Sequence, residues 1–251
     1  MPPWGAGMKK RNGSLSGAGF LLLALTHVCA AASAARDNHA KRHRFKNLPE
    51  IAVTASATWS AAAEFNLFPA AVIANVSVDY GLDHGWNLGL SVLNLEMWQE
   101  GGHIPWNPDG LVNIEKNLVF GENWTAVIGT QNGAAFWDRS RRSRVESYSY
   151  ADNQIRLWDD KLVAHFGGYL ASTAMTGPGD RVGFLAGLRV PLGHERWQLA
   201  LDYVSGNNAL GTGTIQLFWQ IAPGWRLDLG MQLPAPGSPN QYGALFGIGW
   251  H

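Results

Sequence analysis

The sequence predicts an all-β fold: a transmembrane antiparallel up-and-down β-barrel of about twelve strands. Apolar and polar residues alternate with a period of two over segments of about 9 to 11 residues, the length of a tilted membrane-spanning strand. The connections between these segments are alternately short and long. The chain of 251 residues also contains 12 tryptophans and 30 glycines, a composition typical of aromatic belts and closely packed strands.

The first 34 residues predict a secretory signal peptide. Three basic residues at 9–11 precede an apolar run, and Ala32-Ser33-Ala34 fits a small-x-small cleavage site. The apolar core is shorter than the roughly 20 residues that the alternative, a membrane anchor, would need. Cys29, the only cysteine, lies in this segment, so no disulfide or cysteine-bound metal is expected in the mature chain. We expect a basic periplasmic leader at 35–49 and the barrel at 50–251.

The alternation is clearest near the C-terminus, where the odd positions from Trp225 to Leu233 are apolar and the even positions are polar or glycine. The predicted strands are 51–65, 71–80, 86–97, 111–120, 124–132, 145–157, 161–171, 181–191, 196–204, 214–221, 225–233 and 241–250. The segment 51–65 is included because a barrel with both ends on one side of the membrane needs an even number of strands. Ten strands is the alternative count.

Three positions break the alternation. Lys116 falls on the apolar face of its strand, the phase slips between Val92 and Leu95, and Tyr148 and Tyr150 are out of phase with the end of their strand. A β-bulge at each position would restore the pattern. A misplaced strand is the other explanation.

Tryptophans flank the short connections, which we place at 81–85, 121–123, 159–160, 193–196 and 222–224. Short turns of transmembrane barrels face the periplasm, and an indole ring with its N–H donor favours the headgroup region. The sequence therefore predicts a periplasmic aromatic girdle made of Trp86, Trp124, Trp158, Trp197, Trp225 and Trp250.

Inward-facing polar residues of the later strands are the candidate lumen and solute residues: Arg181, Arg189, Asp202, Gln216, Gln220, Arg226, Asp228 and Gln232. One interpretation is that these groups satisfy one another and brace the barrel. The other is a constriction in which arginines hold an anionic or hydroxylated solute. Inward glycines leave space beside this polar wall and favour a cavity there: Gly183, Gly187, Gly230, Gly243, Gly247 and Gly249.

A basic loop is predicted on the extracellular side, with Arg139, Arg141, Arg142 and Arg144. Because arginine pairs well with phosphate, we expect this loop to contact lipopolysaccharide. Steering of an anionic solute toward the pore is the alternative.

The histidines at 84, 103, 165, 194 and 251 share no metal-ligand spacing, so no metal is expected. A lipid hydrolase would need a serine and a histidine at one height on one face of the barrel. His165 with Ser147 or Ser149 is the pair that the sequence offers, but no nucleophile motif surrounds either serine. We assign no catalytic residue and no cofactor.

The strand and turn pattern, with the final segment Tyr242-Gly243-Ala244-Leu245-Phe246-Gly247-Ile248-Gly249-Trp250-His251, resembles Gram-negative outer-membrane β-barrels, in a porin-like form without a specific family. The resemblance implies a place in the cell outer membrane, contact with lipids and lipopolysaccharide, and recognition of the aromatic end by the outer-membrane assembly machinery. The aromatic Trp250 is penultimate here, and His251 is last.

A second resemblance covers residues 48–55, Leu48-Pro49-Glu50-Ile51-Ala52-Val53-Thr54-Ala55, which look like a TonB box. This resemblance implies an extended peptide that pairs with TonB by strand addition, and a first barrel strand that starts later. The alternative is that the segment simply begins strand one.

Three functions are compatible with such a barrel. The first is an outer-membrane channel or facilitator that passes a small polar or anionic solute through a narrow lumen. The second is a non-conducting structural or partner-binding barrel, linked to TonB if the 48–55 segment docks there, and the third is a lipid-modifying enzyme. Nucleic acid is not an expected partner, because the formal net charge is zero.

Overall fold

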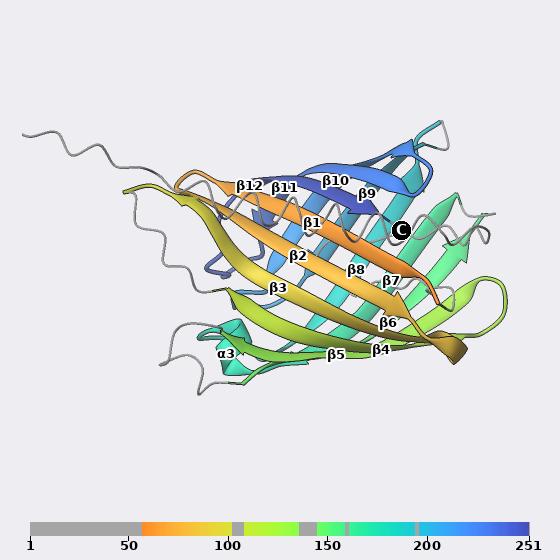
Figure 1. Cartoon of the computed structure of the whole chain (residues 1–251), viewed down its shortest axis with the longest axis horizontal. Helices are drawn as coiled ribbons and strands as arrows, with labels where there is room; N and C mark the ends of the chain where they lie inside the picture. Colours follow the sequence, from red (N-terminus) through yellow and green to blue (C-terminus); the bar gives the residue numbers. More distant parts are fainter. Residues whose placement is uncertain (1–56, 102–107, 136–144, 159–160, 194–195, 251) are drawn as a thin grey trace, which may run out of the picture. The chain divides into compact units, whose positions relative to one another are not determined.

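The protein forms a closed β-barrel (Figure 1). The computed structural model describes residues 57–101, 108–135, 145–158, 161–193 and 196–250. The predicted signal peptide, leader, TonB-like segment and basic loop lie outside these residues. The strands are β1 (Trp59–Phe68), β2 (Ala71–Gly81), β3 (Trp86–Gln99), β4 (Asp109–Val119), β5 (Trp124–Ala135), β6 (Glu146–Leu157), β7 (Leu162–Ala171), β8 (Val182–Pro191), β9 (Trp197–Val204), β10 (Thr212–Ala222), β11 (Trp225–Pro234) and β12 (Gly243–Trp250).

Every strand pairs antiparallel with its neighbours in the sequence, and β12 closes the barrel against β1, with Ala61 opposite Trp250. The predicted fold class and the count of twelve strands are confirmed, and the alternative of ten is wrong. Closure leaves no strand edge with unpaired backbone groups, which is the condition for a sheet to cross a bilayer.

The first strand differs from the prediction. The sequence pattern predicted 51–65, whereas β1 begins at Trp59 and continues to Phe68. Ala57 has a φ of 61°, a left-handed conformation that interrupts an extended backbone. The alternation that runs through Ala57 to Trp59 therefore does not belong to one continuous strand.

The connections define two ends of the barrel. The short-turn end contains 82–85, 120–123, 158–161, 192–196 and 223–224, and includes the 3₁₀ turn η2 (Asp83–Gly85). The other end, the long-loop end, includes the short helix α3 (Thr173–Thr176) and one exception to the pattern, since only Pro69 and Ala70 join β1 to β2. No helix in the described part of the chain is long and apolar enough to cross a membrane.

The outer surface is apolar along the strands. Its exposed large side chains include Leu88, Leu90, Val112, Ile114, Ile128, Phe166, Leu170, Val182, Phe184, Leu188, Leu201, Ile215, Leu229, Met231 and Phe246. In water, such a continuous apolar surface would promote aggregation, but it matches the lipid-facing band of a transmembrane barrel.

The predicted bulge in β3 is present. Leu93 and Asn94 together face the single residue Asn75, because the register shifts between Ala74 and Val76. Asn94 adopts a φ of 57°, and its backbone N–H donates to Asn75 Oδ1 at 3.0 Å. The bulge returns Leu95 to the outer face after the extra residue.

The other two misfit positions have no bulge, because the registers of β3–β4 and of β4 through β7 are continuous. Lys116 does lie on the outer face, opposite Trp86. Its ammonium group is 5.1 Å from the Trp86 ring centroid and donates to the His84 carbonyl, so it reaches the short-turn rim. Tyr148 and Tyr150 point into the barrel and are buried there.

Candidate functional site

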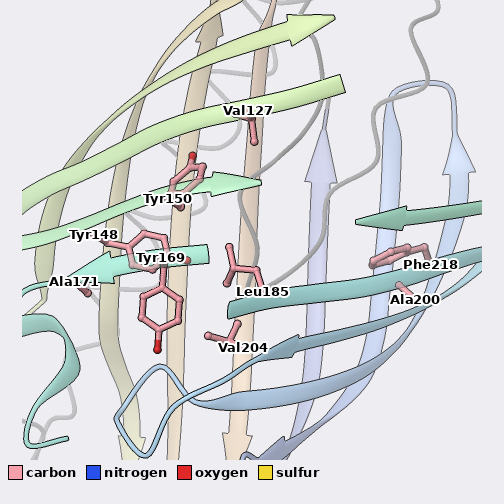
Figure 2. Packing of buried hydrophobic residues seen from close by; sticks show 9 residues of the cluster. All are labelled: Val127, Tyr148, Tyr150, Tyr169, Ala171, Leu185, Ala200, Val204 and Phe218. Carbon is pink, nitrogen blue, oxygen red and sulfur yellow. The ribbon is translucent and has the colours of Figure 1, made fainter. Parts of the chain in front are cut away.

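The interior of the barrel has two different sides. One side, which we term the packed wall, consists of an apolar cluster and a buried ionic network. The apolar cluster contains Val127, Tyr148, Tyr150, Tyr169, Ala171, Leu185, Ala200, Val204 and Phe218 (Figure 2). The ring centroids of Tyr148 and Tyr150, and of Tyr148 and Tyr169, are 5.5 Å apart, a separation at which aromatic rings attract one another.

The ionic network lies next to this cluster and is centred on His165. Its Nδ1 is 3.0 Å from Asp152 Oδ2, its Nε2 is 3.5 Å from Asp202 Oδ1, and all three side chains are fully or almost fully buried. Gly187 makes room for the network, because a Cβ atom there would lie 2.8 Å from Asp202 Oδ1 and closer still to His165 Nε2. Buried charges are stable only beside such partners, so this network ties β6, β7 and β9 together.

Arg189 belongs to the same wall, where it is 2 % exposed. It lies on β8 opposite Ala200 of the apolar cluster. Its position favours the bracing interpretation of Arg189 and Asp202 over a role in holding solute.

The opposite side, which we term the open wall, is formed by the inward faces of β1 to β4 and of β11. It borders a cavity of about 750 Å³. The polar residues around this cavity are Glu64, Asn66, Asn75, Ser77, Asp79, Asn87, Ser91, Asn94, Gln99, Asn113, Glu115, Gln131, Thr212, Gln216, Arg226, Asp228, Gln232, Asn240 and Gln241. The cavity borders β3 from Asn87, its second residue, to Gln99, its last.

Amide side chains orient the carboxylates of the open wall. Asn66 and Asn75 donate to Glu64 Oε1 at 3.1 and 3.4 Å. Asn87 donates to Glu115 Oε2 at 3.4 Å. Hydrogen bonds from neutral amides stabilise a carboxylate without cancelling its charge.

Arg226 lies where the open wall meets the packed wall. Its Nε and Nη2 donate to the two oxygens of Asp228 at 2.6 and 3.1 Å. Its guanidinium carbon is 4.5 Å from the ring centroid of Phe218. A bidentate carboxylate and an aromatic face together fix this guanidinium beside the cavity.

The eight predicted lumen residues do not form one site. Gln216, Arg226, Asp228 and Gln232 line the cavity, whereas Arg189 and Asp202 belong to the packed wall. Arg181 is exposed just before β8, where its Nε donates to the Ala171 carbonyl at 3.2 Å. Gln220 is only partly buried near the short-turn end and donates to the Ala222 carbonyl at 2.7 Å.

At Gly183 and Gly187 the open space that the sequence suggested is filled by neighbouring side chains. The Tyr169 ring lies against Gly183, and His165 lies against Gly187. The cavity lies beside Gln216, Arg226, Asp228 and Gln232 and also borders β1 to β4, whose polar residues were missed. Their signal is in the sequence, since Asn75, Ser77 and Asp79 form a polar alternation within β2.

All six predicted girdle residues lie at the short-turn end. Trp86, Trp124, Trp197 and Trp225 open β3, β5, β9 and β11, Trp158 follows β6, and Trp250 ends β12. The structure adds two that the prediction lacked: Trp59, which opens β1, and Trp219, whose ring stacks on Trp197 with centroids 5.1 Å apart.

The serine–histidine pair that the sequence offers, and to which we assigned no catalytic role, does not come together. His165 faces the interior and contacts two aspartates, whereas Ser147 and Ser149 alternate with the inward tyrosines of β6 and so face outward. The Ser149 hydroxyl lies 3.0 Å from that of Thr130. Among the described residues, no group of three or more His, Cys, Asp or Glu side chains could hold a metal ion.

Comparisons with known proteins identify a fold but no family. No family model matches the chain, and no curated protein matches it significantly. Among solved structures, the KdgM porin has a TM-score of 0.57 at 10 % identity, covering 76 % of this chain and 98 % of that one. The KdgM porin in complex with disordered oligogalacturonate gives 0.55 and the NanC porin 0.50, with the same identity and coverage. The protein thus has a porin-like twelve-stranded barrel.

Proposed function

We propose that this protein is an outer-membrane channel or facilitator that passes a small polar solute along the open wall of its barrel. The observation that carries this proposal is the polar cavity that borders β3 from its second residue to its last. A path for solute needs such hydrogen-bonding groups along its length, because a dissolved molecule exchanges water for them as it moves.

The outer surface supports a place in the membrane. Apolar side chains cover the strands, tryptophans mark the short-turn rim, and solved structures of the same fold are named as porins. We place the short-turn end toward the periplasm, as in barrels with short periplasmic turns. Lipids and lipopolysaccharide are then the surroundings; docking to TonB through residues 48–55 and recognition by the assembly machinery remain predictions.

A more specific alternative for the same channel is that its solute is anionic. One KdgM porin structure is named for a complex with oligogalacturonate, an acidic sugar chain. In this protein Arg226 is the guanidinium at the cavity that would contact such a solute.

A non-conducting barrel is the second candidate function. The packed wall favours it, because aromatic rings and buried ion pairs fill that side of the interior. Such a barrel would act through its surface or its loops.

Conductance of the purified protein in planar bilayers separates the two candidates. A channel gives discrete current steps, and the Arg226→Ala and Asp228→Ala variants change their size because each removes one charge from the cavity. Swelling of liposomes in neutral sugars reports passage of uncharged solute. A correctly folded barrel that gives no steps and no swelling would reject the channel and leave the non-conducting barrel.

A further inference from the structure

Five oxygen-bearing side chains of β2, β3 and β4 form one patch on the open wall. This acceptor patch consists of Asp79, Asn87, Ser91, Asn113 and Glu115, all of which line the cavity. Strand register brings them together. Asn87 lies opposite Glu115, Asp79 and Asn113 lie opposite Gly89 on its two sides, and Ser91 is two residues further along β3.

Gly89 is the residue that lets the patch assemble. It lies opposite Asp79 on one neighbouring strand and opposite Asn113 on the other. A Cβ atom at this position would overlap Asp79 Oδ1 and lie 3.2 Å from Asn113 Nδ2. The missing side chain therefore allows a carboxylate and an amide to approach each other across β3.

Each amide of the patch donates a hydrogen bond within the patch through its nitrogen, and its oxygen is a further acceptor. Asn87 Nδ2 donates to Glu115 at 3.4 Å, and Asn113 Nδ2 donates to Ser91 Oγ at 2.7 Å. Each amide is 5 % exposed, and the Oδ1 atom of each has no hydrogen-bond partner among the described residues. Buried acceptors of this kind require a donor, and the adjoining cavity is where a solute can supply one.

The charges around the cavity also favour a solute that donates hydrogen bonds, because they favour a positively charged one. Its lining carries the four carboxylates Glu64, Asp79, Glu115 and Asp228, and Arg226 is its one basic side chain within the described part of the chain. Arg226 is already held by Asp228. Glu115 accepts from the neutral Tyr150 hydroxyl, which leaves its charge in place. Acidic linings of this kind attract cations and repel anions.

We propose that the acceptor patch binds the ammonium or guanidinium group of a small solute and makes the channel prefer cations to anions. This inference rests on the proposed channel function and specifies the class of solute. The two amide oxygens and the two carboxylates accept the N–H donors of the solute, and the carboxylates balance its positive charge.

The test is the reversal potential of the channel in a KCl gradient. The wild-type protein is expected to pass K⁺ more readily than Cl⁻. Replacing Asp79→Asn and Glu115→Gln together should lower that permeability ratio by about twofold per charge removed. Glu122→Gln is the matched control, because Glu122 is exposed in the turn between β4 and β5, away from the cavity, and its ratio should equal that of the wild type.

A variant that adds a negative charge to the patch tests the same inference if the double variant fails to fold. Asn113→Asp adds a carboxylate to the same patch and should raise the preference for K⁺. Agmatine, which carries both an ammonium and a guanidinium group, should reduce the wild-type current and act more weakly on the double variant. Galacturonate at the same concentration should leave the current unchanged.

The outcomes separate this inference from the channel function itself. Current steps that favour Cl⁻, or a K⁺ preference that neither the double variant nor Asn113→Asp changes, would overturn the acceptor patch while leaving the channel intact. Absence of any current from the folded protein would overturn the channel and the inference with it.

Discussion

The packed wall and the open wall are inward faces of one continuous sheet, and both carry carboxylates. In the packed wall, Asp152 and Asp202 meet His165 within 3.5 Å, and none of the three lines the cavity of about 750 Å³. In the open wall, Glu64 and Glu115 meet neutral amides beside a cavity. An inward charge in a barrel can therefore brace the fold or face the solute, and its neighbours across the strands decide which of the two it does.

The largest effect should come from crowding the packed wall. Gly187→Leu places a side chain where His165 and Asp202 now meet. Overpacking and separation of a buried ion pair should together destabilise the barrel by at least about 4 kcal/mol. Urea unfolding in lipid vesicles, followed by tryptophan fluorescence, measures the change.

Gly168→Ala is the control for that substitution on the neighbouring strand. A Cβ atom at Gly168 meets nothing nearer than the Gly183 carbonyl oxygen at 3.4 Å. This variant should unfold at nearly the wild-type urea concentration. Equal destabilisation by both substitutions would mean that glycine flexibility, rather than the space beside His165, is what the barrel needs.

A smaller effect is expected from His165→Leu, which keeps the bulk but removes both contacts to Asp152 and Asp202. Two buried carboxylates then face an apolar side chain, and the free energy of unfolding should fall by about 3 kcal/mol. The same urea titration measures it. A stability equal to the wild type would show that the histidine does not hold the network together.

The strands and the gathering of tryptophans at one end of the barrel were predictable because both follow a local rule. The outward residues of β11 are apolar at every second position, and a tryptophan opens or closes strand after strand at the same end. The first strand was less predictable, since Ala61, Ala62 and Ala63 give no contrast between its two faces. The sequence did not indicate whether Tyr148 and Tyr150 point outward or inward, because tyrosine suits a lipid rim and a packed interior equally well.

Which inward residues pack against one another and which face the cavity was not predictable, because this depends on contacts between side chains of different strands. Whether Asp202 faces solute or His165 depends on the register across β8, where Gly187 separates them. Polar alternation in β2 and β4 is a signal for the open wall that the sequence analysis missed. No local pattern indicates whether aromatic rings fill the space in front of those residues.

The smallest effect concerns the contact between the two walls. The Tyr150 hydroxyl, from the packed wall, donates to Glu115 of the open wall. Tyr150→Phe removes this hydrogen bond but keeps the ring in its cluster, so stability should fall by about 1 kcal/mol and conductance should persist. Loss of all current in this variant would mean that the phenol itself lines the path.

The division of the lumen is tested most directly by chemical access during conduction. Ser77 lines the cavity, whereas Ala200 is a fully buried member of the apolar cluster. Two variants, Ser77→Cys and Ala200→Cys, are each made in a Cys29→Ser background, so that each carries a single cysteine. A thiol-reactive methanethiosulfonate is then added to the open channel. We expect rapid loss of current for Ser77→Cys and no change for Ala200→Cys. Equal reaction at both positions would contradict a lumen divided into a packed wall and an open wall.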